Sequence, residues 1–106
     1  LDISGSVLNI SNNLIQNMSD KGLSIGEKSQ ANIFDNYIEK NNIGIALKDG
    51  SKICLKHNSL VENSDELLIY IKKSMYQMPS LFIDDQNMDL KNMMWQNCNV
   101  NNFIKI

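Results

Sequence analysis

The sequence of 106 residues contains no arginine, one histidine, one proline and two cysteines, and each shortage excludes or weakens a class of function. Without arginine, a site cannot hold carboxylates or phosphates through the two parallel hydrogen bonds that a guanidinium offers. The formal net charge of −2 lacks the basic excess of a nucleic-acid-binding protein, so we expect no nucleic-acid partner. One histidine and two cysteines that lie far apart in the sequence also argue against a zinc site.

Long hydrophobic runs are absent as well. The uncharged runs are interrupted by asparagine and serine and are too short to cross a bilayer, so we expect no membrane span. No stretch resembles a signal peptide. Because the chain begins at Leu1 without an initiator methionine, the missing targeting signals say little about its location.

Asparagine, in contrast, is abundant, with 16 of the 106 residues. It favours turns and left-handed backbone conformations and is poor in helix interiors, which argues against a helical bundle. Asn13, Asn36 and Asn58 recur at spacings of 23 and 22, each with an aliphatic residue three positions before it and another two positions after it. A coding bias would scatter asparagine instead of placing it in register, so the spacing indicates a structural repeat.

Serine and glycine repeat with the same period. A serine lies seven residues before each of these asparagines, and a fourth serine continues the series: Ser6, Ser29, Ser51 and Ser74. Gly22 and Gly44 lie seven residues before the second and third of these serines. Several independent columns that share one period indicate a solenoid in which each repeat forms one coil.

Between these markers the apolar residues alternate, as in Leu8/Ile10 and Leu23/Ile25, which is typical of half-buried strands. Strands this short cannot pair within one coil, but each can pair with the same strand one coil away, at about 4.8 Å. We therefore predict an all-β fold, a right-handed parallel β-helix (solenoid) with about four to five coils of 22–23 residues and three short sheets. The repeated asparagines are expected to turn inward and satisfy backbone groups at a tight bend, as an asparagine ladder.

The whole chain, residues 1–106, is expected to be a single β-helix domain that belongs to a longer protein. Residues 1–74 form regular coils in this prediction, whereas residues 75–106 form an irregular terminal coil because the period blurs there. Since Leu1 starts within the pattern, the first coil would expose a strand edge. End-to-end association with another chain could occur through that edge.

The spacing Asn-x-Ile, as in Asn13-x-Ile15 and Asn36-x-Ile38, together with the Gly-Ile strand at Gly44, resembles the parallel β-helix repeats of pectate-lyase-like and NosD-like proteins over residues 1 to about 74. Four segments are also similar to β-helix regions of bacterial surface proteins, some of them joined to a CotH-like domain: Asp2–Ser6, Asp20–Glu27, Gly44–Ser51 and Tyr70–Lys73. The resemblance implies a bacterial protein that is secreted or displayed on the cell surface.

Stacked coils turn columns of the sequence into spatial rows, and one of these rows is charged. Aligning the coils on the serine column places Ser4, Glu27, Asp49 and Lys72 in one row, with Lys48 beside Asp49. In one interpretation, these are solvated turns whose opposite charges offset repulsion between coils, each exposed pair contributing at most about 1 kcal/mol. In the other, Glu27 and Asp49 hold a cation or a sugar, and their coupled carboxyl groups could serve acid–base chemistry.

The second interpretation defines a candidate site. Its candidate catalytic residues are Glu27, Asp49 and Lys72. Its candidate ligand-binding residues are Asp20, Lys21, Glu27, Lys48, Asp49 and Lys72. Calcium at Glu27 and Asp49 is the one metal that this row could hold, and no other cofactor is expected.

Functions of different classes remain open at this point. The first is a carbohydrate-associated binding or structural module that presents a stacked face to a polysaccharide; a purely structural spacer is its simplest form. The alternative is a fragment of a polysaccharide lyase or glycoside hydrolase, so whether the chain is an enzyme stays open. The resemblance to pectate-lyase-like proteins implies acidic calcium ligands beside a basic residue, often arginine, for which Lys72 or Lys48 would have to substitute.

The cysteines and the histidine are assigned structural roles. Cys54 and Cys98 lie 44 residues apart, close to two coils. Two strand spacings amount to ~9.6 Å, and a disulfide requires Cα atoms within about 7 Å. We therefore expect two free thiols, and we expect His57 to be structural or surface-exposed.

Overall fold

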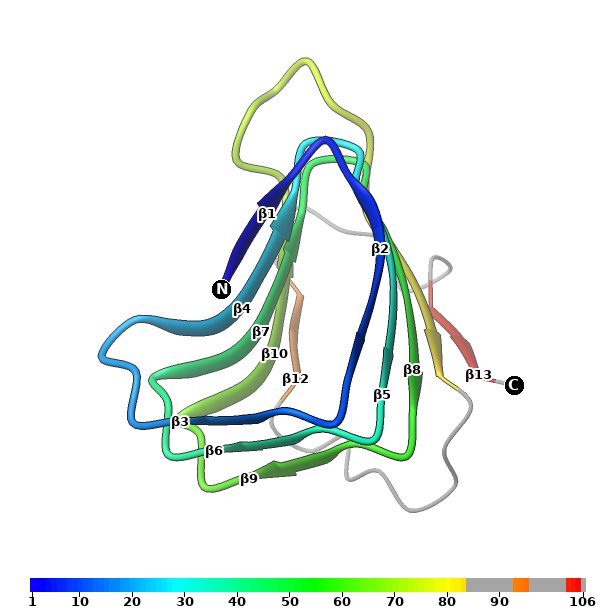
Figure 1. Ribbon diagram of the computed structural model, residues 1–106. Coiled ribbons are helices and arrows are strands. Elements are labelled where there is room, and N and C mark those ends of the chain that lie inside the picture. The colour runs from blue at the N-terminus through cyan, green and yellow to red at the C-terminus, as the bar shows by residue number, and fades with distance from the viewer. Residues whose placement is uncertain (84–92, 96–102, 106) are drawn as a thin grey trace.

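A computed structural model describes residues 1–83, 93–95 and 103–105 of the chain. In these ranges every regular element is a β-strand, and the strands form three parallel sheets (Figure 1). The first sheet contains, in order, β1 (Asp2–Ser4), β4 (Lys21–Gly26), β7 (Ile43–Lys48), β10 (Asp65–Tyr70) and β12 (Met93–Trp95). The second contains β2 (Val7–Ser11), β5 (Gln30–Phe34), β8 (Lys52–Lys56), β11 (Ser80–Ile83) and β13 (Phe103–Lys105). The third contains β3 (Leu14–Gln16), β6 (Tyr37–Glu39) and β9 (Ser59–Val61).

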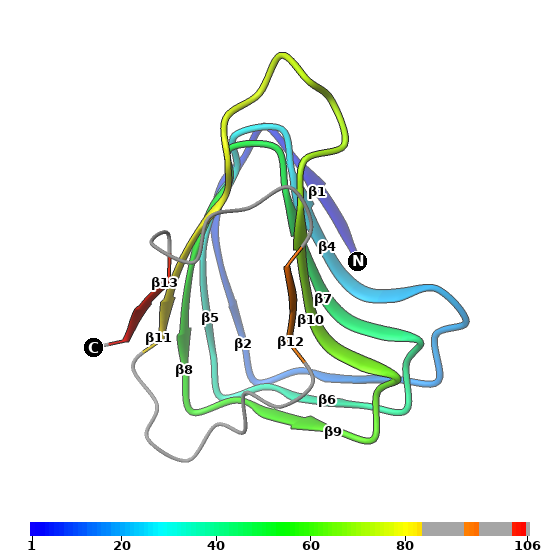
Figure 2. The same ribbon diagram turned by 180° about the vertical axis from the view of Figure 1, so that it is seen from behind.

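Each complete coil contributes one strand to each sheet, so neighbours within a sheet come from successive coils. β1 to β3, β4 to β6 and β7 to β9 form three complete coils, and β10 to β13 extend the first two sheets. In Figure 1 the chain runs clockwise as it recedes from the N-terminus, and Figure 2 shows the same coils from behind, so the solenoid is right-handed. The predicted parallel β-helix is confirmed. No helix that could cross a membrane occurs in the part of the chain that the structure describes.

Aliphatic columns fill the interior and run from coil to coil. In the first sheet Ile25 pairs with Leu47, and Leu47 pairs with Ile69. In the second sheet Ile33 pairs with Leu55. All five side chains are buried. Each contributes about 1.5–3 kcal/mol by leaving water, so these columns are the main attraction between coils.

The asparagine ladder lies at the bend between the second and third sheets. The Oδ1 of Asn36 accepts hydrogen bonds from the backbone N–H and the side-chain amide of Asn13, both at 3.0 Å. The Oδ1 of Asn58 accepts the same two bonds from Asn36, at 3.1 and 3.0 Å. The side-chain amides of Asn36 and Asn58 donate to the carbonyls of Ile10 at 2.9 Å and Ile33 at 2.7 Å. The predicted ladder is confirmed, because each amide satisfies backbone groups that the bend removes from sheet pairing.

A residue with positive φ stands before each ladder asparagine: Asn12 at 58°, Asp35 at 58° and His57 at 54°. Asparagine, aspartate and histidine are the non-glycine residues most often found in this conformation. His57 is exposed there, and its Nδ1 lies 3.8 Å from Oδ1 of Asp35. His57 was expected to be structural or surface-exposed, and the structure shows it exposed.

A second ladder, absent from the sequence predictions, lies at the bend between the third and first sheets. The Oδ1 of Asn41 accepts the N–H of Met18 at 2.9 Å, and the Oδ1 of Asn63 accepts the N–H of Asn41 at 3.0 Å. Glu66 ends the ladder, because its two carboxylate oxygens accept the backbone N–H and the side-chain amide of Asn63, each at 3.0 Å. Asn41 and Asn63 are separated by one period, but Met18 takes this place in the first coil. The column of two asparagines therefore gave only a weak signal.

The glycine column faces this second ladder. A Cβ on Gly44 would lie 2.6 Å from the carbonyl oxygen of Glu66 and 3.1 Å from Nδ2 of Asn63. A Cβ on Gly22 would lie 2.8 Å from the carbonyl oxygen of Gly44. Glycine recurs here because adjacent coils approach too closely for any side chain.

The serine column is confirmed in the first three coils. The backbone N–H of Ser6 donates to Oγ of Ser29 at 3.2 Å, and that of Ser29 donates to Oγ of Ser51 at 3.1 Å. Ser29 and Ser51 are fully buried. The hydroxyls thus link the turns between the first and second sheets, as the asparagines link the next bend.

The prediction that Ser74 continues this column is wrong. Ser80 pairs with Lys52, so the residue aligned with Ser51 in the next coil is Pro79 and not Ser74. The register between adjacent coils is 22 residues where Lys48 pairs with Tyr70, and 28 residues where Lys52 pairs with Ser80. The turn over residues 71–79 is therefore six residues longer than the one below it, and Ser74 is exposed in it.

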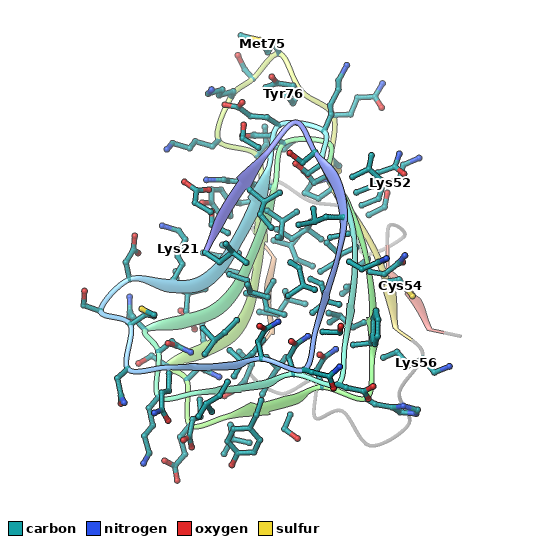
Figure 3. All side chains as sticks on the ribbon, in the orientation of Figure 1. Lys21, Lys52, Cys54, Lys56, Met75 and Tyr76 are labelled. Carbon is teal, nitrogen blue, oxygen red and sulfur yellow. The ribbon has the colours of Figure 1, made fainter. Side chains whose placement is uncertain are left out.

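Cys54 is a free thiol on the outward side of β8, between Lys52 and Lys56 (Figure 3). It is half-buried, whereas its neighbours Ile53 and Leu55 point into the core. Cys98 lies outside the described residues.

Candidate functional site

The outer face of the first sheet is made of small residues in its middle and charged residues around them. Ser24 pairs with Asp2 on one side and with Ala46 on the other. Ser24, Gly26 and Ala46 are buried although they point away from the core, because longer side chains cover them. Lys48 is one of these, since a Cβ on Gly26 would lie 2.7 Å from Cε of Lys48.

Two adjoining hollows lie on this face, of about 160 Å³ and about 320 Å³. Asp2, Lys48 and Lys72 line both of them. We call this surface the charged face; it consists of the residues that line the two hollows. Lys21 projects from it beside β4 in Figure 3.

All six predicted site residues line the charged face. Glu27, Lys48, Asp49 and Lys72 line the smaller hollow, and Asp20, Lys21, Lys48 and Lys72 line the larger one. The stacking of coils therefore brings residues that are distant in the sequence onto one surface.

The predicted row has the wrong register in detail. Ser4 pairs with Gly26 and not with Glu27, while Val7 pairs with Gln30, so the second coil has one extra residue in its turn. Similarly, Tyr70 pairs with Lys48, which places Lys72 at the start of the long turn and not directly above Asp49. Turn lengths differ between coils, and an alignment on serine alone does not detect this.

Glu27 is tied to two neighbours at the rim of the smaller hollow. Its carboxylate accepts hydrogen bonds from the ammonium of Lys73 and from the hydroxyl of Ser4. Both bonds lower the pKa of Glu27 below its usual range, and the bond from Lys73 has the larger effect. Glu27 therefore stays ionised further into acid solution than a free glutamate, and the pairing is lost only as the pH falls through that lowered pKa.

Asp49 lies beneath the rim and is only 1% exposed. Its Oδ1 accepts the backbone N–H of Lys72 at 2.7 Å and that of Lys73 at 2.9 Å. Two backbone donors satisfy a buried carboxylate well. The carboxylate of Asp49 therefore binds the backbone at the rim and is not exposed to solvent.

The lysines of the charged face differ in whether they are paired. The Nζ of Lys21 bonds to both oxygens of Asp20, at 3.1 and 3.0 Å, and this bond raises the pKa of Lys21 against the opposing effect of burial. Burial also raises the pKa of Tyr70, which stands next to Lys48 in the sheet. Among the described residues, no carboxylate lies within ion-pair distance of the ammonium groups of Lys48 and Lys72. Two cationic groups are therefore available to an anionic ligand.

Asp2, Ser24 and Lys73 also line the charged face and were not among the predicted site residues. Asp2 is in register with Ser24 one coil away, so aligning the coils on their strands, instead of their turns, would have found this pair. Lys73 follows Lys72 directly, but nothing in the sequence indicates that it turns towards Glu27.

These observations define a class: a right-handed parallel β-helix protein that carries a charged face on one of its sheets. One protein family, described as periplasmic copper-binding protein (NosD), matches residues 3–87. The match covers well over half of the chain, which therefore belongs to the NosD family. The description places that family in the periplasm, in agreement with the secreted or cell-surface location that the resemblance implied. No curated protein and no solved structure matches the chain.

The family description names copper, and the described residues contain no cluster of histidine, cysteine and carboxylate side chains that could hold it. Copper in proteins is held by clustered imidazole, thiolate and thioether groups. Within residues 1–83, 93–95 and 103–105, no three His, Cys, Asp or Glu side chains come together as a metal site would require. Cys54 stands on the outer side of β8, and His57 is exposed beside Asp35.

Proposed function

We propose that the chain is a binding module of a bacterial protein that is secreted or displayed on the cell surface, and that its charged face holds an acidic polysaccharide. One observation carries the proposal. All six residues chosen from the sequence surround a floor of small side chains, and Lys48 and Lys72 offer ammonium groups that have no carboxylate partner among the described residues.

The chemistry of the face suits a sugar chain that carries carboxylates. Each free ammonium can form a charge-assisted hydrogen bond with a uronate carboxylate. Asp2 and Asp20 can accept hydrogen bonds from sugar hydroxyls. Lys48 and Lys72 line both adjoining hollows, so a sugar chain that lies in the hollows would pass both ammonium groups. An extended polymer could therefore lie across several coils.

The geometry supports binding better than catalysis. A glycoside hydrolase needs a carboxyl group that holds a proton near neutral pH, whereas the pKa of Glu27 is lowered by Lys73 and Ser4. Asp49 is buried, and its Oδ1 is engaged by two backbone N–H groups. A calcium ion between these two residues would have to displace Lys73 from Glu27, so binding should be measured with and without calcium.

Replacing Lys48 by methionine tests the proposal, because methionine keeps an unbranched stem over Gly26 and removes only the charge. We expect the affinity for an oligogalacturonate, measured by isothermal titration calorimetry, to fall about tenfold or more, as for loss of one charged hydrogen bond. Added salt should weaken binding by the wild-type chain.

Lys52→Met is the matched control, since Lys52 projects from the second sheet and does not line the charged face. It should bind as the wild type does, and a neutral cello-oligosaccharide should bind weakly to all three chains. Equal losses from Lys48→Met and Lys52→Met, or equal affinity for neutral and acidic sugars, would contradict the proposal.

A further inference from the structure

The long turn over residues 71–79 departs most from the regular coil. It projects beyond the shorter turns of the other coils in Figure 1, and Met75 and Tyr76 mark its outer part in Figure 3. Met75 is 81% exposed. The backbone on both sides of this turn still pairs with the coil below, so something must hold the extra residues where the turn leaves the sheet.

Asp49 holds the turn at its first residues. Its backbone N–H donates to the carbonyl of Tyr70 at 3.3 Å, and its Oδ1 accepts the N–H groups of Lys72 and Lys73. Asp49 therefore bonds to the chain both before and after Ile71. Asp49 itself has a φ of 53°, a left-handed backbone conformation at the start of its own turn.

The N–H of Tyr76 also donates to the carbonyl of Lys73 at 3.0 Å within the turn, and two side chains of the turn contact lower coils. Lys73 bonds to Glu27 of the coil two below, and the Nζ of Lys28 lies 5.9 Å from the centre of the Tyr76 ring. Lys73 is thereby directed to the rim, while Lys72 lines both hollows. Because the backbone of these two successive lysines is fixed, their side chains reach different places on the charged face.

We propose that Asp49 is a positioning residue: its buried carboxylate fixes the backbone of Lys72 and Lys73 and so holds the Lys72 ammonium over the charged face. This inference rests on the proposed function for its ligand, although the anchoring itself is a property of the free chain. Asp49 does not touch the polysaccharide.

Three variants of the chain separate anchoring from binding. Asp49→Asn keeps an oxygen that can accept both N–H groups, Asp49→Ala removes it, and Lys72→Met removes the ammonium alone. Met75→Ala is the control, since it alters the same turn at an exposed position outside the charged face. Should Asp49→Ala fail to fold, Asp49→Ser replaces it, because its hydroxyl is too short to reach the two donors.

Amide hydrogen exchange at residues 72 and 73 measures, without any ligand, whether Asp49 holds the backbone of the turn. We expect Asp49→Ala to lose protection at these two amides, and Asp49→Asn and Met75→Ala to keep it. In calorimetry with oligogalacturonate, Asp49→Ala and Lys72→Met should each weaken binding by about five- to tenfold. The double variant should bind no more weakly than Lys72→Met alone, because both changes remove the same interaction.

Retained protection in Asp49→Ala, or losses of affinity that simply add in the double variant, would overturn the inference. If the wild-type chain does not bind oligogalacturonate, the proposed function fails, and with it the role of Asp49 in binding. The exchange data then still decide whether Asp49 anchors the turn, so the two failures are distinguishable.

Discussion

Replacing Asn36 by alanine should lower the free energy of unfolding by about 3 kcal/mol, since unpaired buried polar groups each cost about 1–3 kcal/mol. The substitution removes the oxygen that accepts the backbone N–H of Asn13 and the amide that donates to the carbonyl of Ile10. It also removes the contact with Asn58. No other side chain of the coil can take over, because the ladder position faces the interior. Urea denaturation followed by circular dichroism measures the change.

The matched control is Asn32→Ala in the same coil. Asn32 points outward from β5 and is exposed, and its side chain bonds only to that of Asn9 among the described residues. We expect a change within about 0.5 kcal/mol, as for ordinary surface substitutions. Similar losses for the two variants would mean that the inward ladder has no special role in holding the coils together.

Replacing Glu66 by glutamine should cost about 2 kcal/mol although the two side chains have nearly the same shape. Both carboxylate oxygens of Glu66 accept hydrogen bonds from Asn63. Glutamine would place an NH₂ group against one of these donors. Asn63 cannot rotate its amide to compensate, because its Oδ1 already accepts two bonds from Asn41.

Glu62→Gln provides the comparison, since Glu62 is exposed and lies in the bend just before Asn63. The same urea titration should find it nearly as stable as the wild type. If Glu66→Gln were equally well tolerated, the carboxylate would not be required to end the second ladder.

The coil and the first ladder could be predicted because several columns repeat with one period. Asn36, for example, is marked by its own spacing, by a serine seven residues before it and by aliphatic residues on both sides. Such repeated spacings identify the segments that have the same length in every coil. The hydrogen bonds of Asn36 then follow from the need to satisfy backbone groups at a bend.

The turns could not be predicted as well, because their lengths vary independently of the strands. Ser74 has the spacing of the serine column, yet the six extra residues of the long turn move it to the surface. The second ladder contains only two identical residues, Asn41 and Asn63, and ends on Glu66, so the repeated letter that marks it is too short to stand out. Sequence spacing identifies identical residues in register, but it does not detect an interaction that a different residue type supplies.

Part of the composition of the charged face could be predicted from the sequence, but the contacts of its residues could not. Stacking brought the six predicted residues to one surface, because strands in register carry distant residues together. Their individual contacts were beyond the sequence. The pairing of Lys73 with Glu27, and the burial of Asp49, depend on where the long turn leaves the sheet.

A crystal structure of the chain grown with an oligogalacturonate tests the central claim most directly. The account predicts an ordered sugar in the two hollows of the charged face, with a uronate carboxylate within hydrogen-bond distance of Lys48 or Lys72. Sugar density confined to the outer face of the second sheet, over Asn9 and Asn32, would contradict the account. An empty charged face at saturating ligand, with Lys48 and Lys72 positioned as in the free chain, would contradict it as well.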